Sequence, residues 1–242
     1  IDVELVHLTG FPESTQRSMV QEAILEEIST PFDLQNGPLL KCRLLKTDTL
    51  EHVLLLNMHH IVSDGWSMGI FVRELLTLYD DFSHNRPISL SDLPIQYADF
   101  AHWQRNWLKG EVLEQEIQYW REKLDGCSPT LNMQTDRPRP AVKTFNGERI
   151  RFEFPARLNE LLEATSRREN VTPFMVLQAA FAALLSKYSG QEDLNIGSPI
   201  ANRNRKETET LIGFFVNTLV FRNDLSGSPT FSEFLQRVKQ TA

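Results

Sequence analysis

Residues 53–65 read Val-Leu-Leu-Leu-Asn-Met-His-His-Ile-Val-Ser-Asp-Gly. The apolar run at 53–58 predicts a strand, and two histidines follow directly at its end. Neighbouring side chains of an extended segment point to opposite sides. We therefore expect one imidazole of His59 and His60 to face a cavity and the other to pack into the structure. Imidazole changes its charge near neutral pH, which suits proton transfer, so this segment is the first candidate for an active site.

Metal binding and a purely structural role are the alternatives for this segment. Two side chains that point apart do not suit one metal ion, and Asp64 is the one further ligand candidate close by. For Asp64 itself, an ion pair that shapes the loop is favoured over a carboxylate that orients an imidazole. Gly65 permits a backbone shape that other residues resist, and its N–H is a candidate donor to an oxyanion.

The composition excludes several classes of protein. The chain has 242 residues, 41% of them hydrophobic and 24% charged, with a formal net charge of −7. These values are typical of a soluble globular protein, and the negative charge argues against nucleic acid or an anionic membrane as the main partner. The longest apolar stretch, 174–185, is too short to span a bilayer. Cys42 and Cys127 are interpreted as reduced thiols of a cytoplasmic protein.

Apolar periodicity predicts alternating helices and strands, which indicates an α/β fold. The expected helices are 14–30, 67–82, 95–108, 111–125, 157–168, 173–188 and a face at 231–238, and the expected strands are 2–6, 38–46, 51–58, 148–154 and 193–199. The turn residues 47–49 predict an antiparallel hairpin. Four prolines within 126–147 suggest a boundary, so two lobes are expected at 1–128 and 129–242. Both termini lie inside such patterns, which we interpret as the ends of a fragment.

Two later segments carry further signals. Residues 212–222 are mainly apolar, and Asn217 interrupts them, so a buried amide with hydrogen-bond partners is expected there. Residues 97–103 place aromatic side chains at helical spacing, which favours a role in the core over a ligand site. Asp99 and His102 are expected on the solvated or satisfied face of that helix.

Taken together, residues 58–67, 97–103 and 212–222 resemble, in order, three motifs of nonribosomal peptide synthetase condensation domains. The His-His-x-x-x-Asp-Gly pattern alone also occurs in a wider acyltransferase superfamily that includes chloramphenicol acetyltransferase. Residues 135–138 and 199–203 extend the resemblance over nearly the whole chain. It implies two lobes like chloramphenicol acetyltransferase in a V-shaped pseudo-dimer. The family's Ser-x-x-Gln, Arg-His-Glu and Gln-Asp-x-Pro-Phe motifs are missing from this sequence, so truncation at both ends is expected.

The resemblance also implies a reaction. A carrier-bound aminoacyl or peptidyl thioester is the donor, and the α-amine of a carrier-bound aminoacyl thioester is the acceptor, with both substrates in the L configuration. The implied partners are upstream and downstream peptidyl carrier domains and the adenylation domain of the same synthetase. Both substrates hang from phosphopantetheine arms, so no bound cofactor or metal of its own is expected.

Roles for single residues follow from the same resemblance. His60 is expected to position the amine and accept part of its proton, with His59 as the supporting neighbour. Asp64 is expected to pair with Arg203 and so to tie the lobes together. The predicted catalytic group, which includes two candidates for steadying the tetrahedral intermediate, is His60, His59, Asp64, Gly65 and Asn217.

Two other functions remain open at the level of sequence. A stand-alone acyltransferase that uses a coenzyme A or small-molecule thioester would share the chemistry of the His-His loop. A non-catalytic module that docks carrier proteins would carry the loop without using it. The Asn217 motif and the interrupted termini favour the condensation reaction over the stand-alone acyltransferase. Carrier binding that is unchanged when the channel is blocked, without activity in the full-length protein, would favour the docking module.

Overall fold

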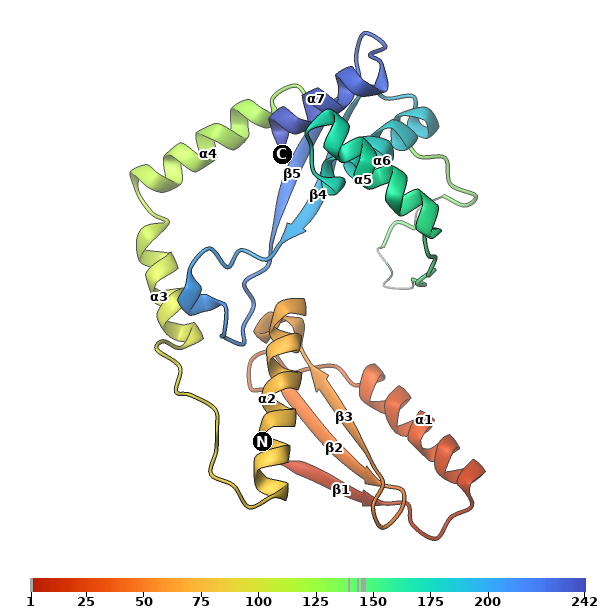
Figure 1. Cartoon of the computed structure of the whole chain (residues 1–242), viewed down its shortest axis with the longest axis vertical. Coiled ribbons are helices and arrows are strands. Elements are labelled where there is room, and N and C mark those ends of the chain that lie inside the picture. The colour runs from red at the N-terminus through yellow and green to blue at the C-terminus, as the bar shows by residue number, and fades with distance from the viewer. Residues whose placement is uncertain (1, 139, 143, 145–146) are drawn as a thin grey trace. The chain divides into compact units, whose positions relative to one another are not determined.

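The computed structural model describes residues 2–138, 140–142, 144 and 147–242 (Figure 1). Ile1, which opens the chain, and Arg139, which belongs to the proline-rich boundary, lie outside the described residues. The chain folds into two compact units. Unit 1 consists of Ile1–Asn106 and Ala201–Asn217, and unit 2 consists of Trp107–Ile200 and Thr218–Ala242. The lobe boundary at residue 128 stays a prediction.

Unit 1 contains a three-stranded sheet in the order β1-β2-β3, formed by Val3–His7, Leu40–Lys46 and His52–Met58. β1 runs parallel to β2, and β2 runs antiparallel to β3. The predicted hairpin is therefore confirmed. Its register pairs Leu40 with Met58, which fixes the point where β3 ends and the His-His segment begins. The helix α1 (Glu13–Ser29) lies beside β3 (Figure 1).

The remaining elements of unit 1 follow the His-His segment or return to it late in the chain. A short 3₁₀ turn, η1, follows β3, and α2 begins three residues after that turn ends. Pattern and structure agree on α2 and α3 to within two residues at each end. These elements are η1 (His60–Val62), α2 (Gly65–Ser83), α3 (Tyr97–Trp107) and η2 (Lys206–Thr208).

Unit 2 packs helices around α6 (Figure 1). Its helices are α4 (Glu111–Leu124), α5 (Ala156–Glu169), α6 (Pro173–Ser189) and α7 (Phe231–Thr241). Its two paired strands are β4 (Asp193–Ile200) and β5 (Asn217–Asp224), of which the first residue of β5 still belongs to unit 1. Ala179 and Ala182 of α6 are fully buried, and they share a core with Phe234, Leu235 and Val238 of α7. Small alanines let the two helices approach closely. The predicted apolar face near the end of the chain is thus confirmed.

The strand predicted at 148–154 is wrong, because no strand is assigned to these residues. Their alternating pattern does produce an aromatic row, since the rings of Phe152 and Phe154 contact each other at a centroid distance of 5.6 Å. Alternation predicts an extended backbone with one apolar face. A strand also needs a neighbour for its backbone N–H and C=O groups, and the described strands provide none beside this segment.

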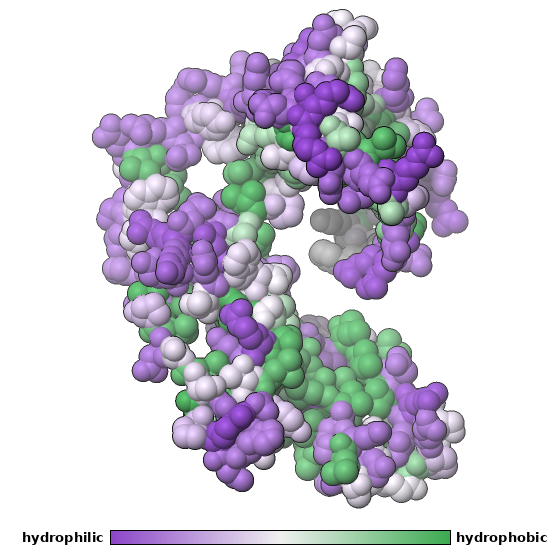
Figure 2. All heavy atoms as spheres, in the orientation of Figure 1, coloured by the Kyte–Doolittle hydropathy of each residue, from purple (hydrophilic) through white to green (hydrophobic). Residues whose placement is uncertain are grey.

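Apolar side chains lie on the surface of unit 1 over the strands and α2 (Figure 2). Examples are Val3 and Leu5 on β1 and Leu76 and Phe82 on α2, all at least half exposed. Across the described residues, no single helix is long and apolar enough to cross a membrane. The pair α5 and α6 passes that test jointly, by length and composition, with a bend of 102° between the two helices.

Candidate active site

The His-His segment lies at the end of β3, as the apolar run predicted. His59 is still extended, with φ −68° and ψ 137°, and its N–H donates to Leu39 O at 3.0 Å. His60 opens the 3₁₀ turn η1. His59 is half-buried and His60 is exposed. The two imidazoles therefore have different environments.

The His59 ring is fixed by two contacts. Its Nδ1 accepts a hydrogen bond from the Ile61 N–H at 3.0 Å. The ring also forms a T-shaped pair with the Phe32 ring, with centroids 5.5 Å apart. Because Nδ1 acts as an acceptor, the neutral ring carries its hydrogen on Nε2. His59 thus has the contacts of a supporting residue.

The His60 ring contacts one aromatic side chain. It forms a T-shaped pair with Phe214, with centroids 5.4 Å apart and an interplanar angle of 84°. The hydrogen bonds found within the described residues involve neither of its ring nitrogens. Both nitrogens are consequently available to an amine, a water molecule or another external group.

Asp64 is buried, with 4% of its surface exposed, and its carboxylate caps α2. One oxygen accepts hydrogen bonds from the Ser67 N–H at 2.8 Å, the Ser67 hydroxyl at 2.7 Å and Arg203 at 3.2 Å. The other accepts from the N–H groups of Phe215 at 3.0 Å and Val216 at 3.3 Å. Burial works to raise the pKa of Asp64, but the hydrogen bonds from Ser67 and Phe215 and the charge of Arg203 outweigh it and lower the pKa to about 2.

Arg203, predicted as the partner of Asp64, is also buried and lies 3.2 Å from it, between Nη2 and Oδ1. Its other terminal nitrogen, Nη1, donates to the carbonyl oxygens of Thr208 and Leu211, the latter at 2.8 Å. The guanidinium carbon lies 4.0 Å from the centroid of the Phe215 ring. Both members of the ion pair belong to unit 1, so the role of tying two lobes together stays a prediction.

Ser67 is a central residue that no sequence pattern singled out. It is fully buried, and its hydroxyl oxygen lies 2.7 Å from Asp64 Oδ1 and 2.8 Å from Arg203 Nη2. The same oxygen lies 2.8 Å from Gly213 O and 3.1 Å from Gly213 N. The single hydroxyl proton serves one acceptor at a time, while its lone pairs accept from Arg203 and Gly213. Ser67, Asp64 and Arg203 together form what we call the buried junction.

Segment 212–217 rests on the aromatic residues of α3. The Tyr97 hydroxyl donates to Phe214 O at 2.8 Å, and burial raises the pKa of Tyr97, as does the nearby Asp64 charge, so the phenol keeps its proton. Phe100 and Phe215 pack at a centroid distance of 4.7 Å. A Cβ on Gly213 would lie 2.1 Å from Tyr97 Cδ2, which explains the glycine. The predicted core role of residues 97–103 is confirmed.

Two expectations about the remaining candidates are wrong. Asn217, expected as a buried amide, is exposed at the first position of β5. Gly65 has no positive φ, and a Cβ there would meet nothing within 4 Å, so the backbone does not require glycine. What Gly65 does offer is its place as the first residue of α2, where helix N–H groups lack intrahelical acceptors.

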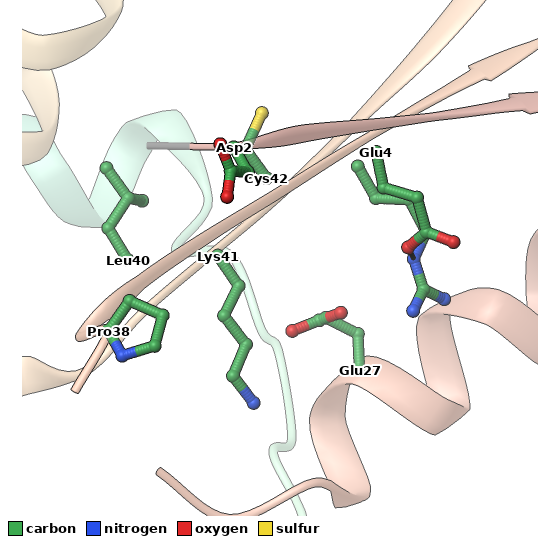
Figure 3. Close-up of a pocket in the computed structure, with 8 residues that line it drawn as sticks. Asp2, Glu4, Glu27, Pro38, Leu40, Lys41 and Cys42 are labelled. Atoms are coloured by element: carbon green, nitrogen blue, oxygen red, sulfur yellow. Dashed lines mark hydrogen bonds and ion pairs between the residues drawn. The ribbon is translucent and has the colours of Figure 1, made fainter. Parts of the chain in front are cut away.

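A pocket on unit 1 is lined by other residues, although Pro38 and Leu40 in its wall flank Leu39, whose carbonyl oxygen accepts the His59 N–H. Figure 3 shows a pocket between β2 and α1 whose walls include Pro38, Lys41 and Glu27. None of the residues drawn there is a predicted site residue. In the part of the chain that the structure describes, no cluster of three or more His, Cys, Asp or Glu side chains is placed to hold a metal ion.

Comparisons with known proteins agree with this fold. A family model described as "Condensation domain" matches residues 1–242. The chain is 53% identical to one of the linear gramicidin synthase proteins of Brevibacillus parabrevis over 98% of its own length, but it spans 3% of that protein. The X-domain from teicoplanin biosynthesis matches with a TM-score of 0.87 and 27% identity over 100% of this chain and 53% of that structure. The first condensation domain of the CDA synthetase matches in fold, with a TM-score of 0.69 and 21% identity over 100% of this chain and 53% of that one. The predicted α/β fold of this family is confirmed.

Proposed function

Because the chain belongs to the condensation domain family, we propose that it forms amide bonds between two carrier-bound substrates. The amine nitrogen of the acceptor attacks the carbonyl carbon of the donor thioester. A C–N bond forms, the C–S bond breaks, and the released thiolate takes up the proton that the amine loses. The observation that supports this reaction best is the buried junction, which holds segment 212–217 beside the exposed His60.

His60 acts on the amine. A free α-amine has a pKa of about 7.7–8.0, so part of it is neutral near pH 7 before any catalyst acts. Holding the amine against the thioester therefore contributes most, since good positioning lowers a barrier by roughly 7–11 kcal/mol. Acceptance of a proton by His60 adds a factor of about 10²–10⁴. The unengaged nitrogens of His60 suit both tasks.

The other predicted residues assist at different points. His59 keeps the strand end in shape, since its ring is already engaged with Ile61 and Phe32. Asp64 has no free acceptor position directed at an imidazole and acts by holding the loop. Two groups are candidates for stabilising the oxyanion of the tetrahedral intermediate. They are the N–H of Gly65, the first residue of α2, and the side-chain amide of Asn217, the first residue of β5, and both residues are exposed.

Partners follow from the reaction. Upstream and downstream peptidyl carrier domains present the donor and the acceptor on phosphopantetheine arms, and the adenylation domain of the same synthetase loads them. The domain then needs no cofactor of its own. We further propose that the donor and the acceptor both have the L configuration. The proposed location of the protein is the cytoplasm. The 53% identity to a linear gramicidin synthase protein supports this setting.

The choice of donor tests the proposal. In the full-length protein, we expect amide product from donor and acceptor loaded on carrier domains, and a rate at least tenfold lower when coenzyme A thioesters replace them. His60→Ala should lower the carrier-dependent rate by about 10²–10⁴. His102→Ala is the matched control, because His102 is exposed on α3 and its ring contacts Asn106 of the same helix.

Two results would favour the other functions. Equal rates with coenzyme A thioesters and loaded carriers would indicate a stand-alone acyltransferase. Tight carrier binding without amide product in either assay would indicate a docking module.

A further inference from the structure

We propose that Phe214 is a positioning residue that sets the orientation of the His60 ring. The inference rests on the proposed role of His60 in amide formation. The two rings form a T-shaped pair with centroids 5.4 Å apart, inside the range of about 4.5–7 Å in which aromatic rings attract each other. Phe214 is 39% exposed, so it is not a core residue. Its ring lies at the surface beside the imidazole of His60.

The backbone that carries Phe214 is held on both sides. Its own carbonyl oxygen accepts the Tyr97 hydroxyl at 2.8 Å. Gly213, before it, donates its N–H to the Ser67 oxygen, and its carbonyl oxygen shares the single Ser67 hydroxyl proton with Asp64. Phe215, after it, donates its N–H to Asp64. Because buried groups hold this backbone in place, the Phe214 ring can fix the orientation of the neighbouring His60 ring.

His60 needs such a support more than His59 does. His59 has a ring contact with Phe32, at 5.5 Å and 78°, and also a hydrogen bond from the Ile61 N–H to its Nδ1. For His60 the described residues provide the ring contact without a hydrogen bond. Removing the Phe214 ring therefore frees His60 to turn about its side-chain bonds, whereas removing the Phe32 ring leaves the hydrogen bond of His59 in place.

The same contacts explain how the buried junction influences the position of the His60 imidazole. Asp64 bonds to the backbone that follows Phe214, through the N–H groups of Phe215 and Val216. Both oxygens of its carboxylate are occupied by these and the other donors of the junction. Phe214 then transmits the position of that backbone to the imidazole. Disturbing the junction moves His60 by way of this ring.

The test compares variants with and without the ring in the full-length protein. Phe214→Leu and Phe214→Met remove it, Phe214→Tyr keeps it, and Phe32→Leu is the matched control at the neighbouring histidine. One readout is the single-turnover rate of amide formation with both carriers loaded. The other is the rate at which diethyl pyrocarbonate modifies His60, measured by peptide mass spectrometry, which needs no activity.

An aromatic pair of this kind corresponds to a factor of about two to ten in rate. We expect Phe214→Leu and Phe214→Met to slow amide formation by that factor and to speed the modification of His60. Phe214→Tyr should restore both values, and Phe32→Leu should change the amide rate less than twofold.

Unchanged modification of His60 in both ringless variants, or a Phe32→Leu rate as low as that of Phe214→Leu, would overturn the inference. A His60→Ala variant with full activity would instead overturn the proposed function. In that case the modification rate still reports whether Phe214 orients the ring.

Discussion

Replacing Asp64 with asparagine should loosen segment 211–217 by a large amount. The substitution removes the negative charge from a buried carboxylate that accepts hydrogen bonds from Ser67, Arg203, Phe215 and Val216. Half of the asparagine amide is a donor, and it would face at least one of these donors. Arg203 keeps its charge and loses its counter-ion in a site where only 8% of the residue is exposed.

The size of the effect follows from the burial of both partners. Removing one member of a buried ion pair costs about 3–5 kcal/mol, because the other charge stays buried and uncompensated. The lowered pKa of Asp64, about 2 against an ordinary 3.8, corresponds to about 2.5 kcal/mol in favour of the charged form, which is of the same order. If this loss lowers the free energy of local unfolding of segment 211–217 by the same amount, amide exchange in the segment should become about 10²–10⁴ times faster.

Hydrogen–deuterium exchange with mass spectrometry measures this in the full-length protein. The informative peptides cover 211–217, since the N–H groups of Phe215 and Val216 donate to Asp64. Asp193→Asn is the matched control, because its ion pair with Arg222 is partly exposed and belongs to unit 2. Exchange in Asp64→Asn within threefold of the unchanged protein would refute the reasoning about the buried junction.

Three further outcomes follow from the same contacts. The pKa of Asp64 is lowered on folding, so its stabilisation is complete above about pH 4 and is lost as the pH falls toward 2; circular dichroism between pH 5 and 2 should show an acid transition that Asp64→Asn shifts or removes. Gly213→Ala should destabilise unit 1 by about 1–3 kcal/mol in urea unfolding, because its Cβ displaces the Tyr97 ring. Adding Tyr97→Ala to the same chain should recover part of that loss of stability. Ser67→Ala should cost about 1–3 kcal/mol in the same assay, since the Gly213 N–H loses its acceptor, and a loss below about 0.5 kcal/mol would contradict this.

Local patterns predicted the part of the site that depends on nearby residues. The apolar run before His59 predicted a strand, and the strand's end places both histidines. The aromatic spacing at 97–103 predicted a helix with a core face, and Phe100 and Tyr97 do lie in the cluster with Phe215. Each of these inferences uses residues within one turn or one strand of each other.

The contacts that join distant segments had no such local signal. Ser67 and Gly213 are 146 positions apart, and no periodicity in either segment indicates that the Ser67 oxygen lies within hydrogen-bond distance of both backbone groups of Gly213. The pairing of Asp64 with Arg203, 139 positions apart, came from family resemblance and not from spacing. An Asp followed three residues later by Ser at a helix start was the available sign, since it places a hydroxyl next to the capping carboxylate.

Errors at three positions have a common cause. The apolar neighbours of Asn217 suggested burial, the Asp-Gly pair suggested a special backbone at Gly65, and alternation at 148–154 suggested a strand. A local sequence pattern indicates which conformations and environments a residue is compatible with. Its exposure, its φ angle and its strand pairing also depend on the distant segments that pack against it.

The central claim is that His60, supported from segment 212–217, is the imidazole that works on the amine. The most direct test is a single-turnover comparison of His60→Ala and His59→Ala in the full-length protein with both carriers loaded. The claim predicts a loss of about 10²–10⁴ for His60→Ala and a loss of less than about tenfold for His59→Ala, with hydrogen exchange at 211–217 unchanged in both. A larger loss for His59→Ala, or an undiminished rate for His60→Ala, would contradict it.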